Sequence, residues 1–235
     1  MAPLIISHRG KIDLSSQENT LVGIQEVIDL GIEMVEFDVR KTKDNVLICY
    51  HDANIQNIPI SEIYFEQLKE RVPEVCSLVE VIDICKEKIG VNVEIKESGF
   101  ESIIVELLTK NFEYDSFFVT SFFPLIIRKI KKLDARIQAG LLLGHGFNLS
   151  VYYRVIKESM FMNDFLYSNA DFISPYYKIY ELGLMAKFKE LEIPIQLWTV
   201  NDIGLLKDLI NSDIQSIVTD IPEKALQIRS NSNNV

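Results

Sequence analysis

The chain has 235 residues, a mass of 27.0 kDa and a hydrophobic fraction of 48%, which suits one α/β barrel of ordinary size or two small domains. Its formal net charge of −10 at pH 7 argues against a general nucleic-acid or anionic-membrane binder, because the long-range field repels polyanions. An anionic substrate would therefore need local neutralisation by a cation or by a few basic side chains.

Short apolar runs that are typical of buried parallel strands recur along the chain. They are rich in Ile, Val and Phe and are apolar on both faces. Eight strands are predicted in this way: Leu4–Ser7, Met34–Val39, Val91–Ile95, Phe117–Ser121, Ile137–Leu142, Phe172–Ser174, Ile195–Thr199 and Ser216–Thr219.

Segments with a helical period lie between these strands. A helix over residues 21–28 is expected to be capped by Asn19 and ended by Gly31, and another to follow Asp202. A third is expected over residues 179–188. Because no linker interrupts the alternation, the pattern predicts a single (β/α)8 TIM barrel over residues 1–229, with a doubly wound open sheet as the alternative. The polar residues 230–235 are expected to form a disordered tail.

One strand-like run, Val46–Tyr50, follows the second barrel strand too closely for a crossover helix. The residues Asp44 and Asn45 are therefore expected to form a two-residue hairpin turn, since both tolerate positive φ. In that register Asp38 faces His51 at roughly 5 Å between the backbones. The hairpin would bring His51 to the carboxyl end of the strand, where barrel active sites form.

Three carboxylates are expected to converge at this end of the barrel. Glu36 and Asp38 are two apart in a strand and so point the same way, and Glu94 ends another strand with Lys96 two residues on. Such a group would repel strongly without a cation, and oxygen-only ligands suit one Ca²⁺ or Mg²⁺ ion. Ordinary salt-bridged strand ends are the alternative interpretation.

The remaining candidates supply acid–base chemistry and anion binding. His8 and His51 are expected to act as general base and general acid at phosphorus, because histidine titrates near working pH. Arg9 and Lys96 would hold the phosphoryl oxygens. Trp198, the only tryptophan, is a candidate wall against the alcohol part of a substrate.

Other polar residues near these motifs have supporting or structural interpretations. Asp52 is expected to orient the hairpin or its neighbour His51, and Glu18 and Asn19 to cap the first helix and buttress the site. His145 lies in a glycine-flanked loop and is left out of the site.

The three cysteines, Cys49, Cys76 and Cys85, are odd in number and are expected to be buried and reduced. The sequence enters a strand-like run at Pro3 without a charged leader, and no stretch of eighteen apolar residues is present. These features favour a cytoplasmic protein without stable membrane insertion and without a nucleic-acid partner.

The motifs, taken in order, resemble those of the glycerophosphodiester phosphodiesterase family, and the likeness spans nearly the whole chain. The segments that carry it are His8–Gly10, Glu18–Thr20, Glu36–Asp38, Thr42–Asp44, His51–Asp52 and Glu94–Lys96, with later echoes at Ser121–Phe122, Trp198–Asn201 and Thr219–Pro222.

The resemblance implies a TIM barrel that hydrolyses small-molecule glycerophosphodiesters to an alcohol and sn-glycerol 3-phosphate. By position, His8 and His51 match the acid–base pair of the family, and Arg9 and Lys96 match its phosphate contacts. The metal ligands of the family match Glu36, Asp38 and Glu94.

This sequence departs from the family pattern after Asp52, where Ala53–Asn57 replaces a leucine and an arginine and the inserted subdomain is short. In the family that insertion shapes the alcohol pocket, so the substrate stays open. One alternative is a lysophospholipase D or sphingomyelinase D-like enzyme that acts on single-chain phospholipids. Another is a catalytically silent binding module, although each matched histidine and carboxylate is retained.

Overall fold

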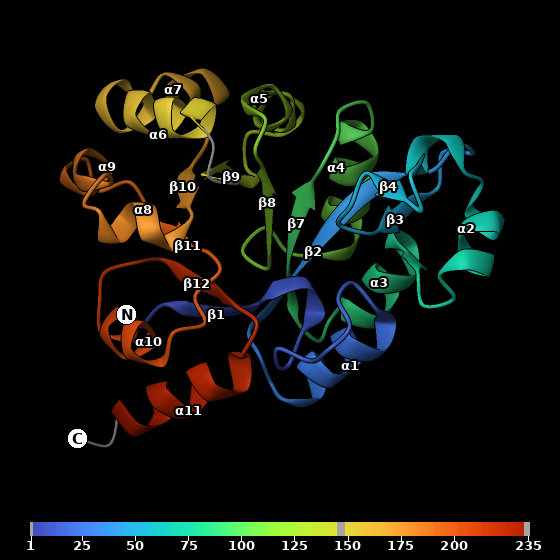
Figure 1. The fold of residues 1–235 in the computed structure, drawn as a ribbon, viewed down its shortest axis with the longest axis horizontal. Coiled ribbons are helices and arrows are strands. Elements are labelled where there is room, and N and C mark those ends of the chain that lie inside the picture. Colours follow the sequence, from blue (N-terminus) through green and yellow to red (C-terminus); the bar gives the residue numbers. More distant parts are fainter. Residues whose placement is uncertain (1, 145–148, 233–235) are drawn as a thin grey trace.

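A central barrel of parallel strands organises the molecule (Figure 1). The structure is a computed structural model and describes residues 2–144 and 149–232. The barrel strands are β1 (Leu4–Ser7), β2 (Met34–Lys41), β7 (Gly90–Ile95), β8 (Phe117–Ser121), β9 (Gln138–Leu143), β10 (Phe172–Pro175), β11 (Gln196–Leu197) and β12 (Ser216–Thr219).

The strand pairing distinguishes a barrel from an open sheet. The hydrogen-bonded order is β10-β9-β8-β7-β2-β1-β12-β11, and single parallel bridges from Ile173 to Ile195 and from Tyr176 to Trp198 join its two ends. The nearly closed (β/α)8 barrel is thus confirmed, and the open-sheet alternative is wrong. Each predicted strand is present, although β11 is shorter than expected.

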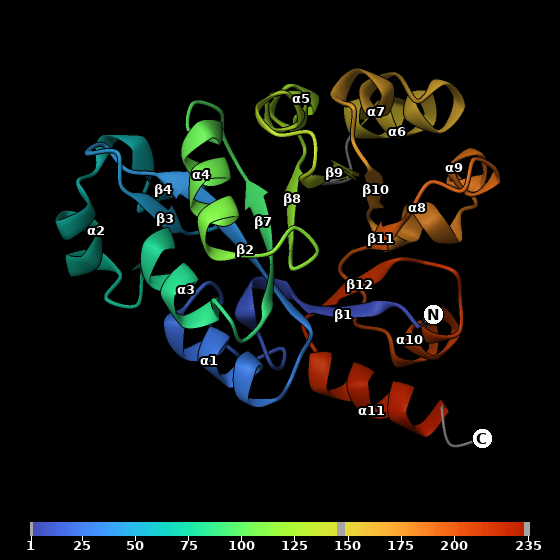
Figure 2. The same cartoon turned by 180° about the vertical axis from the view of Figure 1, so that it is seen from behind.

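Helices surround the barrel on the outside, as Figures 1 and 2 show. They pack on the apolar outer faces of the strands, which include the fully buried Phe37, Val93 and Val119. The helices are α1 (Leu21–Asp29), α3 (Leu78–Cys85), α4 (Glu101–Asn111), α5 (Pro124–Leu133), α6 (Leu149–Phe161), α7 (Asn163–Ser168), α8 (Tyr177–Glu181), α9 (Ala186–Glu190), α10 (Ile203–Ile210) and α11 (Pro222–Ser232).

The inside of the barrel is apolar at one end and polar at the other. Met34 on β2 packs there with Phe118 and Phe172, and its alternate neighbours Glu36 and Asp38 lie on the same face further along the strand. The apolar end is tightly filled: a Cβ atom added to Gly140 would lie 2.1 Å from Cε2 of Phe172. Apart from the buried hydrogen bond that Ser216 donates to Gln196 (3.1 Å) at the start of β12 and β11, polar side chains gather toward the carboxyl end of the strands.

Two helix predictions need correction. The hydroxyl of Thr20, and not the side chain of Asn19, caps α1 by accepting a hydrogen bond from the N–H of Gly23 (3.1 Å). Residues 179–188 form two short helices, α8 and α9, because Gly183 breaks the helical path with a φ of +72°. The predictions of Gly31 as the end of α1 and Asp202 as the cap of α10 agree with the structure.

The end of the chain also differs from the expectation. Helix α11 continues to Ser232, so residues 230–232 of the predicted tail are helical. Residues 233–235 lie outside the described part of the chain.

The hairpin after β2 forms, but in a different register. Strand β3 (Leu47–Cys49) pairs with β2 so that Cys49 lies opposite Val39, and the N–H of Tyr50, rather than His51, bonds to the carbonyl of Asp38 (3.0 Å). Thr42 pairs with Val46, so the loop has three residues, 43–45, and Asn45 at its end adopts the left-handed conformation with a φ of +64°. The predicted two-residue turn is wrong.

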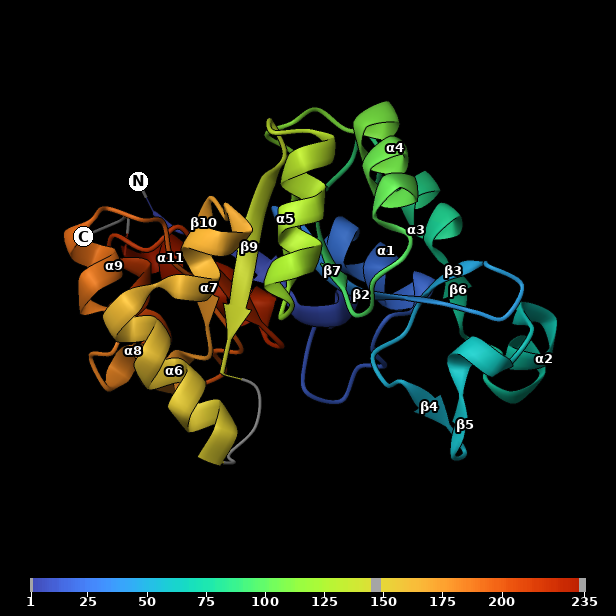
Figure 3. The ribbon, with the colours of Figure 1, turned by 90° about the horizontal axis from the view of Figure 1, so that it is seen from above.

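The short insertion has a small core of its own. It consists of β4 (Asn54–Ile55), β5 (Ile58–Pro59), α2 (Phe65–Arg71) and β6 (Cys76–Ser77), which pairs with β3. In Figure 3 the β4–β5 hairpin and the first turn of α6 both project beyond the ends to which the strand arrows point. The two elements therefore flank the mouth of the barrel. The core of the insertion contains Ile48, Ile55, Ile60, Ile63, Leu68 and Val75.

Candidate active site

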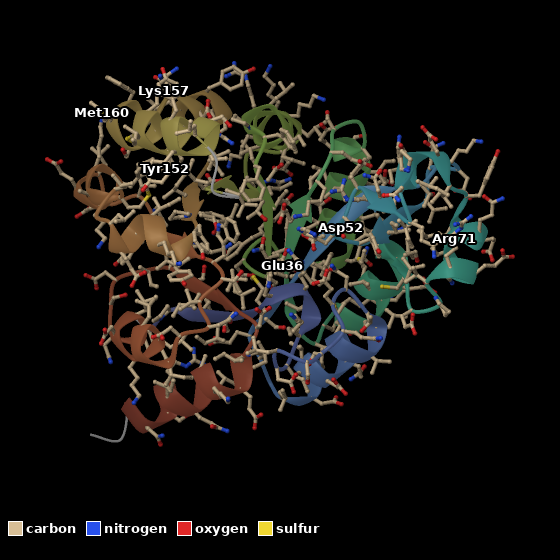
Figure 4. The ribbon with its side chains drawn as sticks, viewed as in Figure 1. Glu36, Asp52, Arg71, Tyr152, Lys157 and Met160 are labelled. Carbon is tan, nitrogen blue, oxygen red and sulfur yellow. The ribbon has the colours of Figure 1, made fainter. Side chains whose placement is uncertain are left out.

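One cavity at the carboxyl end of the strands gathers most of the predicted site residues. Figure 4 shows Glu36 near the centre of the barrel, and Asp38 lies fully buried on the same strand. The predicted residues that line the cavity are His8, Arg9, Glu36, His51, Glu94, Lys96 and Trp198.

The three predicted metal ligands form a compact carboxylate cluster. Glu36, Asp38 and Glu94 each offer an oxygen atom, and these atoms lie within 4.8 Å of one another. Burial and the neighbouring charges of Asp38 and Glu94 raise the pKa of Glu36 well above its usual value. Burial and Asp38 likewise raise the pKa of Glu94 to about 7. A buried set of oxygens that repel one another fits a hard divalent cation such as Ca²⁺ or Mg²⁺.

Basic and amide groups hold Asp38 in its charged form. The Nζ atom of Lys96 lies 2.8 Å from Oδ1 of Asp38, and the Nε atom of Arg9 lies 3.2 Å from Oδ2. Burial alone would raise the pKa of Asp38, but these two cations hold it below its usual range. Asn19 donates from Nδ2 to Oδ2 of Asp38 (2.9 Å) and accepts from the backbone N–H of Asp38 (3.1 Å). Asp38 is therefore ionised and fixed in position.

A tight turn after β1 places Arg9 against the cluster. Arg9 has a φ of +56°, a backbone conformation that residues other than glycine rarely adopt, and Gly10 follows with a φ of +69°. In this conformation the backbone N–H of Arg9 donates to Oε2 of Glu36 (2.9 Å), while Nη1 contacts Glu18 (2.9 Å). The turn thus couples the arginine and one metal-ligand candidate through the main chain.

Each predicted catalytic histidine has a carboxylate partner. Nδ1 of His8 lies 2.8 Å from Oδ1 of Asp220, and Nδ1 of His51 lies 2.8 Å from Oδ1 of Asp52. These contacts orient both rings, as expected for His51 and Asp52, and direct Nε2 away from the carboxylate. Burial and the charge of Lys96 lower the pKa of His51.

Asp220 is a further candidate site residue, which the sequence analysis placed in a motif of the family without assigning it a role. Burial would raise the pKa of Asp220, but the contact with His8 lowers it to about 2. Asn201 donates to Oδ2 of Asp220 (2.6 Å) and fixes it further. Barrel closure pairs Ser7 with Thr219, so the residues that follow them, His8 and Asp220, become neighbours. Adjacency of the first and last strands was the signal that could have revealed the pair.

Trp198 lies at the wall of the cavity with aromatic neighbours. Its Nε1–H donates to the carbonyl of Ser174 (2.8 Å), and its ring meets Phe122 edge-on with centroids 5.5 Å apart. The indole is thus held in one orientation beside the cavity. His145 lies outside the described residues. The cysteines are free and buried, as predicted.

A second pocket of about 350 Å³ adjoins the first at the barrel mouth. The two share His51, Glu94, Lys96 and Phe122, so a group bound between the histidines would extend into this second space. Its apolar walls are Ala53, Ile95, Phe123, Leu143 and Val151, and its charged walls include Arg40, Asp52 and Arg154.

The same motifs and fold occur in known proteins. The profile of the glycerophosphoryl diester phosphodiesterase family matches residues 8–224. This chain belongs to that family. A glycerophosphodiester phosphodiesterase of Caldanaerobacter subterraneus subsp. tengcongensis is 25% identical to this chain. The alignment, 254 positions long, covers 97% of this chain and 98% of that protein. This family membership confirms the prediction that the protein is a phosphoric diester hydrolase.

Solved structures of family members share the fold. The glycerophosphodiester phosphodiesterase from Parabacteroides distasonis superposes with a TM-score of 0.81 at 21% identity and covers 99% of this chain and 98% of its own. A phosphodiesterase from Oleispira antarctica, in complex with the product sn-glycerol-3-phosphate, has a TM-score of 0.79 at 20% identity, with 97% of each chain covered. Within residues 2–144 and 149–232, no helix combines the length and apolar character needed to cross a membrane.

Proposed function

We propose that this glycerophosphoryl diester phosphodiesterase family member hydrolyses glycerophosphodiesters to an alcohol and sn-glycerol 3-phosphate with one bound divalent cation. The observation that carries the proposal is the cavity in which the carboxylate cluster and two histidine–carboxylate pairs meet. The product bound to the phosphodiesterase from Oleispira antarctica supports the choice of substrate.

Glu36, Asp38 and Glu94 would hold the proposed cation, which would supply Lewis-acid polarisation of a phosphoryl oxygen. Arg9 and Lys96 would offset the remaining negative charge of the phosphodiester, because both already lie beside Asp38 at the cavity wall. Trp198 would pack against the carbon skeleton of one substrate arm. These residues bind and orient the phosphorus for in-line attack.

His8 and His51 would move the two protons of the reaction. One ring accepts the proton of the attacking hydroxyl as the new P–O bond forms, and the other donates a proton to the alcohol oxygen as its P–O bond breaks. The carboxylates of Asp220 and Asp52 would stabilise the protonated rings of His8 and His51, respectively. The attacking hydroxyl belongs either to water or to the glycerol of the substrate.

A panel of glycerophosphodiesters assayed with Mg²⁺, Ca²⁺ or EDTA tests this proposal. Phosphorus NMR should detect sn-glycerol 3-phosphate with at least one of the two cations, and EDTA should abolish turnover. A transient cyclic phosphate in the same spectra would identify attack by the substrate hydroxyl. Full activity in EDTA would contradict the cation requirement.

A second candidate substrate is a phospholipid with one acyl chain, cleaved by the same residues in a lysophospholipase D or sphingomyelinase D-like reaction. The observation that favours it is the apolar character of the second pocket, where Phe122, Phe123 and Val151 adjoin His51. Turnover of glycerophosphocholine compared with lysophosphatidylcholine separates the two substrates.

A further inference from the structure

Helix α6 turns its apolar side chains toward solvent. Six large hydrophobic residues of this helix are exposed, with Leu149 at 90% and Tyr153 at 69%, whereas Val155 and the carboxylate residue Glu158 are buried. A surface helix usually shows the opposite arrangement. The exposed side chains are those of Leu149, Tyr152, Tyr153, Ile156, Met160 and Phe161.

The reversed arrangement is specified by contacts of Glu158. Only 2% of this residue is exposed, and its carboxylate accepts hydrogen bonds from the backbone N–H groups of Asp164 (3.0 Å) and Phe165 (2.7 Å). Glu158 therefore compensates the first N–H groups of α7, and this contact fixes which face of α6 points inward. The apolar outer face is a consequence of that orientation.

The outer face of α6 is also free of acidic groups. Lys157 is exposed, Arg154 is half-buried and paired with Asp164 (2.8 Å), and Glu158 is the only acidic residue of the helix. A face of apolar, tyrosine and lysine side chains stands out on a chain with a net charge of −10. Tyrosine and lysine around an apolar stripe are typical of helices that lie at a lipid–water interface.

An apolar cavity of about 220 Å³ lies beneath this helix, beside the pocket at the barrel mouth. It lies between α6 and α8, and its walls include Tyr152, Val155 and Ile179. Gly144 and Val151 line both this cavity and the 350 Å³ pocket that contains His51. Figure 4 shows Tyr152, Lys157 and Met160 along α6, on the other side of Glu36 from Asp52 and Arg71.

We propose that the outer face of α6 docks on the surface of a zwitterionic phospholipid aggregate, and that the cavity beneath it takes the acyl chain of a single-chain substrate. The surface is zwitterionic because the net charge of −10 opposes an anionic one. Docking there would place α6, whose first turn flanks the barrel mouth, against the lipid headgroups. The acyl-chain assignment rests on the proposed phosphodiesterase function, whereas the docking does not.

Vesicle sedimentation tests the docking directly. The probe is phosphatidylcholine vesicles with and without lysophosphatidylcholine. The double variant Ile156→Ser, Met160→Ser removes apolar surface at the centre of the face and should lower the bound fraction at least about tenfold. The matched control is Val22→Ser, Val79→Ser, which changes residues exposed by 71% and 53% on α1 and α3 and should bind like the parent chain.

Activity measurements separate the two parts of the proposal. Neither Ile156 nor Met160 lines the described pockets, so the double variant should hydrolyse glycerophosphocholine within twofold of the parent rate. Its turnover of vesicle-borne lysophosphatidylcholine should fall in parallel with binding. A cavity-filling Val155→Trp variant should lose lysophosphatidylcholine turnover while it keeps glycerophosphocholine turnover and the thermal transition of the parent.

Several outcomes would overturn the inference. Equal vesicle binding by the parent chain and the Ile156→Ser, Met160→Ser variant would exclude docking through α6. A parent chain that sediments as a dimer, becomes monomeric in this variant and ignores vesicles would show that the face binds a second copy. If the protein hydrolyses no phosphodiester at all, the proposed function is wrong. The vesicle experiment still tests the docking of α6, because it does not depend on activity.

Discussion

Replacement of Glu94 by glutamine should stabilise the metal-free protein at alkaline pH. Glu94 lies in the carboxylate cluster, and burial together with Asp38 raises its pKa from 4.5 to about 7. Glutamine has nearly the same shape and resembles the protonated acid, so the substitution removes the charge that the metal-free fold disfavours. The same change removes one oxygen ligand of the proposed cation.

The magnitude follows from linkage between protonation and folding. Because the folded state binds the Glu94 proton more tightly than the unfolded state, its contribution to stability is complete below pH 4.5 and is lost as pH rises to about 7. One pKa unit corresponds to 1.36 kcal/mol, so the loss is about 3 kcal/mol. Glu94→Gln should therefore match the parent chain at pH 4.5 and exceed its free energy of unfolding by about 3 kcal/mol at pH 8.

Urea unfolding in EDTA at several pH values measures this difference. A matched control is Glu101→Gln on α4, where burial would raise the pKa but hydrogen bonds from Ser98 and Lys129 lower it to about 2. That variant should lose stability above pH 4.5, which is the opposite sign. Added Ca²⁺ or Mg²⁺ should stabilise the parent chain more than Glu94→Gln. A Glu94→Gln variant that is no more stable than the parent at pH 8 would refute the reasoning.

Three further variants test catalysis and packing. His51→Ala should lower kcat by about 10² or more while circular dichroism and the unfolding midpoint persist, and a rate within a few-fold of the parent would remove His51 from the acid–base pair. Asp220→Asn should lower kcat by about 10² with little change in KM, because it removes the charge that orients and stabilises His8. An unchanged pH–rate profile would contradict this role of Asp220. Gly140→Ala should destabilise the barrel by about 1–3 kcal/mol through its clash with Phe172, and Phe172→Leu in the same chain should restore part of the loss.

The local sequence pattern was sufficient to predict the barrel and the residues that line the candidate site. Strands such as β2 and β7 are buried on both faces, so their apolar runs stand out in the sequence. The spacing of Glu36 and Asp38 determines that both face the barrel interior, because side chains alternate along a strand. These features depend on neighbours in the chain and can be predicted without coordinates.

Other features depended on interactions that sequence spacing does not encode. The register of the β2–β3 hairpin depends on the left-handed conformation of Asn45. With this conformation the loop has three residues instead of the two that were predicted. Asn19 contacts the site through Asp38, as expected, but it does not cap α1, because the hydroxyl of Thr20 does so. In each case two local solutions were available, and packing selected one.

The class of reaction could be predicted without coordinates, because the histidines, carboxylates and basic side chains of the candidate site lie at recognisable strand ends. The tertiary structure decided the partners of those residues, since only closure of the barrel brings Asp220 at the end of β12 to His8 at the end of β1. It also decided the orientation of α6, where buried Glu158 binds the start of α7 and leaves Tyr152 and Ile156 on the surface. Both features depend on contacts that form only in the folded chain, and a local sequence pattern does not reveal such contacts.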